Sequence, residues 1–194
     1  MEHLTLSVQY EQALVFALHL HRQQYRKGTG IPYFTHLMAV SEMVLEDGGN
    51  EDEAIAALLH DAVEDQGGES TLQEIKQRFG ENVAAIVDGC TDTYQTPKPP
   101  WRERKEKYIQ HLQSASESVK RVALADKLHN SRTILSTYRQ IGEATWMRFN
   151  GGKTGTLWYY RTLVNVFREI HTSPMLEDFT KVVDELERLV EKNK

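Results

Sequence analysis

The spacing of hydrophobic residues predicts helices along almost the whole chain. Apolar side chains recur at intervals of three and four residues, which places them on one face of an α-helix. No run alternates β-branched and polar residues, and no hairpin dipeptide lies between two such runs, so we expect no β-strand. The pattern therefore predicts an all-α fold of about nine or ten helices in one bundle.

Glycine, proline and asparagine interrupt the pattern and separate the expected helices. In the first helix, at 7–24, we expect Val8, Leu14, Val15 and Leu18 to face the core. Further helices are expected at 35–46, 51–64, 71–79, 82–92, 101–112, 116–138, 141–150, 156–171 and 173–192.

The helix expected at 51–64 is apolar enough to be buried, yet polar residues crowd its C-terminal end. His60 and Glu64 form one i,i+4 pair and Asp61 and Asp65 form another, so all four share one side of the helix. Carboxylates at this spacing repel one another, and burying them unpaired is costly. A divalent cation offsets that cost, because it accepts imidazole and carboxylate ligands. These residues therefore indicate a metal centre.

Two further polar residues lie in register with apolar positions elsewhere in the chain. His36 shares a helical face with Val40, and Asp126 follows Val119 and Val122 at intervals of three and four residues. A polar residue within an apolar stripe points inward rather than to solvent. The sequence therefore predicts a set of inward-facing metal ligands, with Glu64 and Asp65 beside them: His36, His60, Asp61 and Asp126.

Composition narrows the class of protein. The 194 residues, of which 40% are hydrophobic and 26% charged, are typical of one soluble globular domain. No apolar run is long enough to span a membrane, the first residues do not resemble a signal peptide, and the single cysteine, Cys90, has no partner in the chain. We therefore expect a cytoplasmic protein that does not bind membranes. The net charge of −5 argues against binding polymeric nucleic acid, although basic residues that gather locally would hold a small anion.

Two basic segments are candidates for such an anion site. Arg26 and Lys27 are adjacent in a glycine-containing loop. Arg104 and Lys105 belong to a basic helix with interspersed glutamates, which is either a salt-bridged surface or a phosphate-binding face. The glycine-rich segment 151–155 lacks the Walker A pattern and follows no strand, so we do not expect it to cradle a phosphate.

Five segments together resemble the HD superfamily of metal-dependent phosphohydrolases, and within it the hydrolase domain of RelA/SpoT enzymes and the stand-alone small alarmone hydrolases. An isolated His-Asp pair would carry little weight, whereas the order and content of all five segments are specific. These segments are PYFTH (32–36), HDAVED (60–65), FGENVAAIVDGCTD (79–92), ERK (103–105) and LADKLHNSRT (124–133).

The resemblance implies a reaction and roles for individual residues. The reaction removes pyrophosphate from the 3′ position of ppGpp or pppGpp by attack of a metal-activated water. The implied roles are Mn²⁺ binding by His36, His60, Asp61 and Asp126, support of the attacking water by Glu64 and Asp65, and nucleotide binding by Asn130 and the basic loop. Fe²⁺ or another divalent ion also suits this mixed nitrogen and oxygen ligand set.

Other assignments concern the substrate and the extent of the domain. We expect Lys105, with Arg104 or Lys27, to neutralise phosphate charge in the transition state. Tyr159 either stacks on or bounds the base, or packs in the core. We expect 1–194 to form a single HD hydrolase domain, with a metal core at about 26–133 and helices at 141–192 that complete the bundle. Because the sequence ends soon afterwards, we expect a hydrolase without a synthetase domain.

Several alternatives remain open at this point. The adenosine analogues ppApp and pppApp are equally possible substrates, because no residue in these segments reads a purine edge. Another HD reaction is possible, such as that of a 5′-nucleotidase, a phosphodiesterase or an NADPH phosphatase. A non-catalytic HD module that binds metal and nucleotide for regulation is a further alternative. The sequence does not fix the oligomeric state.

Overall fold

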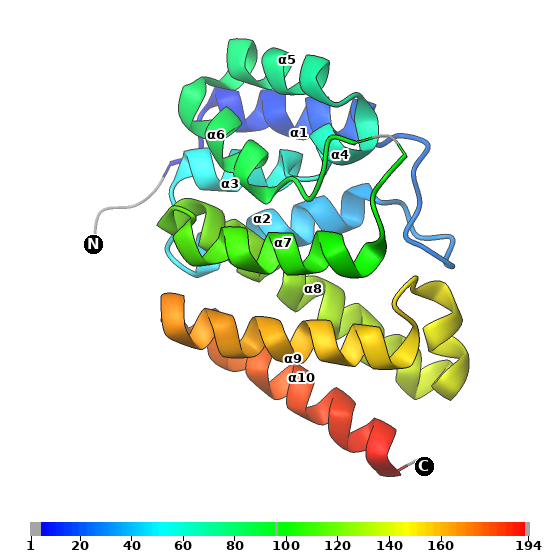
Figure 1. Cartoon of the computed structure of the whole chain (residues 1–194). Helices are drawn as coiled ribbons and strands as arrows, with labels where there is room; N and C mark the ends of the chain where they lie inside the picture. The colour runs from blue at the N-terminus through cyan, green and yellow to red at the C-terminus, as the bar shows by residue number, and fades with distance from the viewer. Residues whose placement is uncertain (1–4, 96, 193–194) are drawn as a thin grey trace.

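Helices account for nearly all regular structure in residues 5–95 and 97–192, which are the residues that this computed structural model describes (Figure 1). The described part contains an isolated β-bridge between Tyr25 and Pro32 but no strand, so the expected all-α class is confirmed. Its ten α-helices and one 3₁₀ helix are α1 (Val8–Leu20), α2 (Phe34–Glu46), α3 (Glu51–Leu59), α4 (Ala62–Gln66), α5 (Glu69–Phe79), α6 (Glu81–Cys90), α7 (Trp101–Ser114), α8 (Glu117–Ile141), η1 (Gly142–Arg148), α9 (Gly152–Ile170) and α10 (Pro174–Lys192).

The long helix α8 is the element around which the others pack. Ser116 caps its N-terminus by accepting a hydrogen bond from the backbone N–H of Val119, and the 25 residues that follow present buried side chains on more than one face. Leu124 and Leu128 are almost fully buried, and burial of each contributes about 1.5–3 kcal/mol. The helix contacts α2, α3, α6, α9, α10 and η1.

Helix α3 lies inside the molecule, and its sequence explains why. Asn50 and Glu53 form a reciprocal capping box at its N-terminus, which satisfies two backbone donors. The run 54–59 is fully buried, and its small residues Ala56 and Ala57 let neighbouring helices approach closely. Helix α3 accordingly packs against α1, α2, α6 and α8.

The prediction of a single helix at 51–64 is wrong, because helix α3 ends at Leu59 and α4 begins at Ala62, with His60 and Asp61 between them. The imidazole Nδ1 of His60 lies 2.8 Å from the carbonyl oxygen of Ala57, and Asp61 has φ −97° and ψ −3°, away from helical values. A side chain that bonds a nearby backbone group competes with the helix for it. The break turns His60 and Asp61 toward the interior of the molecule.

The core face predicted for the first helix is wrong at three of its four positions, since only Leu14 packs against the core. Val8, Val15 and Leu18 are 66%, 50% and 41% exposed, whereas Ala13 and Ala17 are fully buried. Helix α1 packs against α3, and its alanines allow a close approach that larger side chains would prevent. Apolar residues occur on both sides of this helix, so periodicity alone did not select the buried side.

No helix in the described residues is long and apolar enough to cross a membrane. Two connecting segments also contribute to the site. One is the loop between α1 and α2, whose Arg26 donates a hydrogen bond to Asn130 of α8, and the other is the turn between η1 and α9.

Candidate active site

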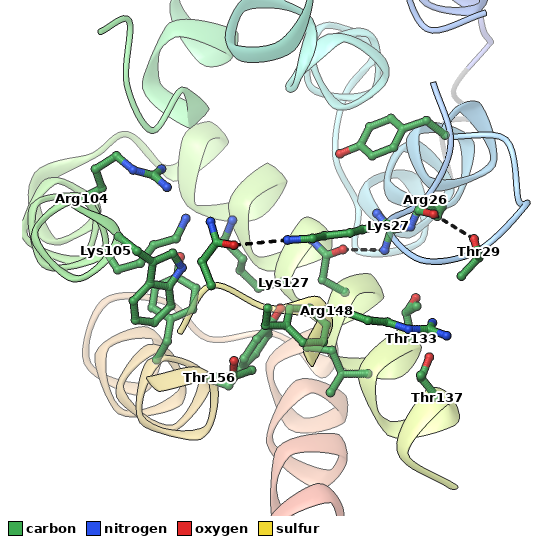
Figure 2. A pocket seen from close by; sticks show the side chains of 18 of the residues that line it. Arg26, Lys27, Thr29, Arg104, Lys105, Lys127, Thr133, Thr137, Arg148 and Thr156 are labelled. Atoms are coloured by element: carbon green, nitrogen blue, oxygen red, sulfur yellow. Dashed lines mark hydrogen bonds between the residues drawn. The ribbon is translucent and has the colours of Figure 1, made fainter. Parts of the chain in front are cut away.

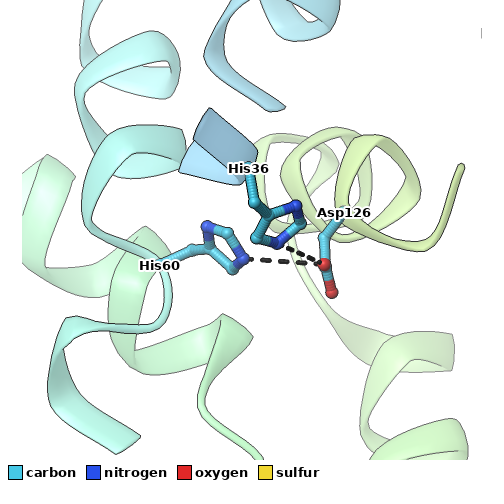
Figure 3. Close-up of side chains that lie close together, drawn as sticks. All are labelled: His36, His60 and Asp126. Carbon is cyan, nitrogen blue, oxygen red and sulfur yellow. Dashed lines mark ion pairs between the residues drawn. The ribbon is translucent and has the colours of Figure 1, made fainter. Parts of the chain in front are cut away.

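Three potential metal ligands converge from three separate helical segments (Figure 3). His36 projects from α2, His60 follows α3 and Asp126 projects from α8. One ligand atom from each lies within 4.8 Å of the others. The carboxylate Oδ1 of Asp126 is 3.1 Å from Nε2 of His36 and 3.6 Å from Nε2 of His60. These distances leave the three groups facing one shared centre.

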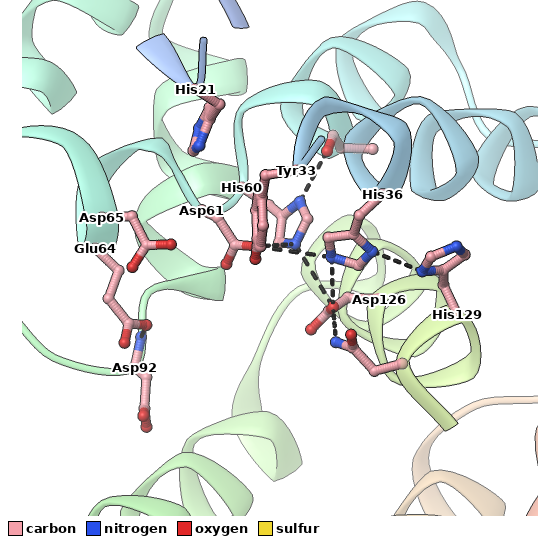
Figure 4. A network of polar contacts seen from close by, with 12 residues as sticks. His21, Tyr33, His36, His60, Asp61, Glu64, Asp65, Asp92, Asp126 and His129 are labelled. Carbon is pink, nitrogen blue, oxygen red and sulfur yellow. Dashed lines mark hydrogen bonds and ion pairs between the residues drawn. The ribbon is translucent and has the colours of Figure 1, made fainter. Parts of the chain in front are cut away.

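The fourth expected ligand, Asp61, lies next to this centre (Figure 4). Its Oδ2 atom is 3.0 Å from Nε2 of His60 and 3.7 Å from Nε2 of His36. The structure therefore brings three of the four proposed ligands into one cluster and places Asp61 beside it, against the two histidines. Asp61 is more exposed than the other three, with a side-chain exposure of 23%.

The donor atoms at this centre fit a divalent cation. The Nε2 atoms of His36 and His60 are buried and form no hydrogen bond, although carboxylate oxygens lie 3.0–3.7 Å away. Buried polar atoms without partners are costly, and an ion shared with the carboxylates would satisfy them. Burial lowers the pKa of His36, which favours the neutral imidazole that a metal requires. Burial also acts to lower the pKa of His60, yet the carboxylates of Asp61 and Asp126 raise it well above its ordinary value.

A second layer of residues holds the four side chains in place. His36 Nδ1 lies 2.7 Å from Nδ1 of His129, and the hydroxyl of Tyr33 donates a 2.5 Å hydrogen bond to Oδ2 of Asp61. Asn130 donates a 2.5 Å hydrogen bond to Oδ1 of Asp126. Such partners fix the orientation of metal ligands and commonly change metal affinity when mutated. His129 therefore supports a ligand and lies outside the cluster of three ligand atoms.

The two acids expected to assist catalysis occupy different positions. Glu64 lines the pocket beside the metal centre. Nζ of Lys98 lies 2.6 Å from Oε1 of Glu64. Asp65 is absent from the described residues that line this pocket, and Gln24 donates a 2.7 Å hydrogen bond to it. Partial burial and the Asp61 carboxylate raise the pKa of Asp65 to about 6. A carboxyl group that titrates near neutrality is suited to exchanging protons with a neighbouring group.

A cavity of about 370 Å³ lies beside the metal centre, between α7, α8, α9 and the loop after α1, and is lined by Tyr33, Lys127 and Asn130, which contact the proposed ligands. All six residues proposed from sequence to contact substrate line it: Arg26, Lys27, Arg104, Lys105, Asn130 and Tyr159. The lining residues that were not proposed include Lys127, Arg148 and Tyr33. Basic side chains thus surround a concave site, as expected for an anionic ligand.

The basic residues of helix α7 lie on two different sides of the helix. Arg104 and Lys105 lie in the pocket and share the buried carboxylate of Asp92. The exposed residues Arg102 and Lys107 instead form i,i+4 salt bridges with glutamates of the same helix. The helix therefore turns one basic side toward the cavity and another toward solvent.

Aromatic residues form the wall opposite α8. Tyr159 is 5% exposed. The centroid of its ring lies 6.1 Å from the ring centroid of Trp101 and 5.2 Å from Nζ of Lys105. A Cβ atom on Gly151 or Gly155 would lie 2.7 Å or 3.0 Å from the Trp101 ring. The glycine-rich segment therefore makes room for an aromatic side chain, and Tyr159 is part of a packed wall.

The residues that sequence analysis missed carried weak signals. Tyr33 lies three residues before His36, so a helical start there places the two side chains on one side. Lys127 is adjacent to Asp126, and its amine lies 2.5 Å from that carboxylate. Arg148 lies in the short helix expected at 141–150, where no neighbouring residue marks it as a site residue, and only the fold brings it to the cavity.

Comparison with known proteins gives consistent results. The family model described as HD domain matches residues 13–149. Over 126 residues, which is 63% of this chain and 68% of the relative, the chain is 40% identical to guanosine-3′,5′-bis(diphosphate) 3′-pyrophosphohydrolase MESH1 of Xenopus tropicalis. The human MESH1 protein is 38% identical over 131 residues, which is 66% of this chain and 70% of that protein.

A solved structure resembles nearly the whole molecule. Its title reads "A metazoan ortholog of SpoT hydrolyzes ppGpp and plays a role in starvation responses". The TM-score is 0.73 at 25% sequence identity, with 96% of this chain and 98% of that chain covered. A much longer relative, the guanosine-3′,5′-bis(diphosphate) 3′-pyrophosphohydrolase of Aquifex aeolicus, is 36% identical over 126 residues, which is 64% of this chain and 17% of that protein.

Proposed function

Because this chain belongs to the HD domain family, we propose that it is a metal-dependent 3′-pyrophosphohydrolase of (p)ppGpp-type alarmones. The observation that carries the proposal is the buried cluster of His36, His60 and Asp126 beside a cavity lined with basic side chains. The activity in the names of the relatives supports the choice of substrate. The adenosine analogues ppApp and pppApp fit the same phosphate chemistry and stay in the proposal.

Mn²⁺ is the proposed cofactor, and Fe²⁺ or another divalent ion would suit the same nitrogen and oxygen donors. Nε2 of His36, Nε2 of His60 and the carboxylates of Asp61 and Asp126 would hold it. When bound, the ion would polarise a phosphoryl oxygen and lower the pKa of water at the site. Tyr33 and His129 would keep Asp61 and His36 correctly oriented.

The reaction breaks the bond between the 3′ oxygen and its phosphorus, with water supplying the new oxygen on phosphorus. The leaving 3′ oxygen takes up a proton, so the products are the nucleoside 5′-diphosphate or 5′-triphosphate and pyrophosphate. Glu64 is the proposed acceptor of the water proton, because it is the acid that lines the cavity next to the ligands. Asp65, with a pKa raised to about 6, is proposed to support it by proton exchange.

The basic residues stabilise the charge of the phosphates. Lys127 lies against Asp126, and Arg104 and Lys105 lie on the opposite wall, where Asp92 holds them. Fixed cations that face developing negative charge stabilise the transition state without reorganising. Arg26 donates a 2.7 Å hydrogen bond to Asn130, which joins the basic loop to the residue that supports Asp126. We place this reaction in the cytoplasm, which the lack of any disulfide-forming cysteine pair supports.

Turnover of defined nucleotides tests the proposal directly. The protein is stripped of metal, reloaded with Mn²⁺ and incubated separately with ppGpp, ppApp, NADPH, a 5′-monophosphate and a cyclic nucleotide. We expect pyrophosphate from ppGpp or ppApp, loss of release after chelation and recovery on adding Mn²⁺ again. Orthophosphate release from another nucleotide would indicate a different HD reaction. Binding without turnover of any nucleotide would indicate a regulatory module.

A further inference from the structure

Arg148 is a pocket residue to which the proposed chemistry assigns no role. It ends η1, and its side chain lies against the backbone of Gly28 in the loop after α1. A Cβ atom on Gly28 would lie 2.8 Å from both Cδ and Nε of Arg148. Gly28 also has a φ of +70°, a value that other residues rarely adopt. The glycine therefore permits the turn and leaves the space in which the arginine rests.

The charge of Arg148 is uncompensated, unlike that of the basic residues near the metal. Lys127 pairs with Asp126, and Arg104 and Lys105 share Asp92. Among the described residues Arg148 has neither an ion pair nor a hydrogen bond with another side chain. Its guanidinium donors are thus available to a ligand in the cavity.

The position of Arg148 relative to α8 shows which part of a ligand it would meet. Asn130, Thr133 and Thr137 follow Asp126 along one side of α8, and all three line the cavity. At 1.5 Å per residue, Thr133 lies roughly 10 Å and Thr137 roughly 16 Å along the helix from Asp126. Figure 2 shows Arg148 reaching toward Thr133 and Thr137, on the side of the pocket away from Arg104 and Lys105.

This distal end of the cavity has the chemistry of a nucleobase site. Phe149 and Ile134, the chain neighbours of Arg148 and Thr133, also line the cavity and provide apolar surface, and Thr133 and Thr137 provide hydroxyl groups. Arg104 and Lys105 lie at the other end, and the guanidinium of Arg26 donates to Asn130, whereas the guanidinium of Arg148 has no such side-chain partner among the described residues. Nucleotide sites are mostly apolar with a few placed polar groups that fix orientation.

We propose that Arg148 reads the purine edge of the substrate and selects guanine over adenine. The inference rests on the proposed alarmone hydrolysis and names the base of its substrate. Guanine presents two acceptors, O6 and N7, on the edge that an arginine fork contacts in a bidentate manner. Adenine presents an amino group in place of O6, so a donor would face a donor. The contact with Gly28 holds the stem of the arginine and limits the freedom that binding must remove.

The test compares kcat/KM for ppGpp and ppApp in the Mn²⁺-loaded full chain. We expect wild-type protein to prefer ppGpp by about 5- to 150-fold, the range for one bidentate arginine–guanine contact. Arg148→Gln should reduce this preference to within about twofold, mainly through slower ppGpp hydrolysis. Arg148→Lys keeps the charge but loses the planar fork, so it should lose the preference as well. Thermal unfolding of each variant checks that the fold is retained.

A matched pair of glycine variants tests the same contact from the other side. Gly28→Ala would displace the Arg148 side chain and should lower the guanine preference without removing any donor. Gly30→Ala, in the same loop, meets nothing within 4 Å and should leave the preference unchanged. In an Arg148→Gln background, Gly28→Ala should change the ratio no further, because the two changes act on one contact.

The outcomes separate this inference from the proposed function. Wild-type turnover of neither alarmone would overturn both. Turnover of both alarmones at equal efficiency would overturn the base assignment and leave the hydrolase intact. An equal loss on ppGpp and ppApp in Arg148→Gln, restored by Arg148→Lys, would show that Arg148 binds phosphate and would also overturn the assignment. A guanine preference that both Arg148 variants abolish supports it.

Discussion

The cavity joins two regions that differ in what holds their side chains. At the metal end, His36, His60 and Asp126 are 0%, 3% and 6% exposed and come from segments packed around α8. At the distal end, Arg148 leaves a short 3₁₀ helix and rests on Gly28 of a loop. Helix packing and buried hydrogen bonds fix the first region, whereas contact between two connecting segments fixes the second. We therefore expect changes at the metal end to abolish chemistry and changes at the distal end to alter substrate choice.

The largest effect is expected from Asp126→Asn, which removes one ligand charge and keeps the side-chain shape. The bound ion stabilises phosphoryl charge by several kcal/mol, so turnover should fall on the order of 10³-fold or more. Metal content and pyrophosphate release measure the two losses together. Asp178→Asn, whose carboxylate is half-exposed and pairs with Arg132, is the matched control. A variant that keeps full activity without metal would remove the contrast between the two regions.

Glu64→Gln separates metal binding from proton transfer within the metal end. The variant should bind Mn²⁺ as wild type does, because Glu64 lies outside the cluster of ligand atoms. Turnover should fall by about 10²- to 10⁴-fold, the usual contribution of a general base. Metal-loaded protein is assayed with saturating substrate, and Glu69→Gln on α5 serves as the control. Wild-type turnover in the variant would exclude proton transfer by Glu64.

Tyr33→Phe tests whether the residues that hold the proposed ligands in place contribute to metal affinity. The change removes the hydroxyl that donates to Asp61 but keeps the ring that packs against His21 and His36. We expect Mn²⁺ affinity to fall by about 10- to 100-fold. Calorimetric titration of metal-free protein measures the dissociation constant, and Tyr25→Phe, at an exposed ring, is the control. An unchanged constant would show that Asp61 needs no support from this hydroxyl.

The smallest effect is expected at the open edge of the pocket, from Lys27→Gln. Lys27 is exposed and lies 3.4 Å from Asn150, so its attraction for phosphate is screened by water. We expect KM to rise by about two- to fivefold with little change in kcat, and to become less sensitive to salt. Lys181→Gln, on the exposed side of α10, should change neither quantity. A large drop in kcat would move Lys27 from the edge of the site to its chemistry.

Sequence patterns predicted the metal end well because its residues are set by helical register. His36 and Asp126 occupy positions in apolar stripes, and such positions point inward whatever the neighbouring helices do. The prediction for His60 and Asp61 placed them correctly even though the helix that carries them is broken there. Side chains that cannot stay buried without a partner thus predict where a candidate site lies before the fold is known.

The remaining features depend on contacts between segments far apart in the chain. Periodicity could not show that His129 would meet His36, or that Arg148 would rest on Gly28, because neither contact lies within one helix. The prediction of which side of α1 is buried failed for the same reason. Helix α1 has apolar residues on both sides, and its packing against α3 determines which of them are buried. The position of a residue on its helix follows from the local sequence, whereas the segment against which that helix packs depends on the whole fold.

Locating the ion in crystals tests the central claim most directly. Crystals of metal-free protein are soaked in Mn²⁺, and anomalous scattering at a wavelength where manganese absorbs locates the ion. We expect one dominant peak at bonding distance from Nε2 of His36, Nε2 of His60 and the carboxylate of Asp126, with Asp61 also facing it. A peak at another set of side chains, or none at this cluster under conditions that support turnover, would contradict the account.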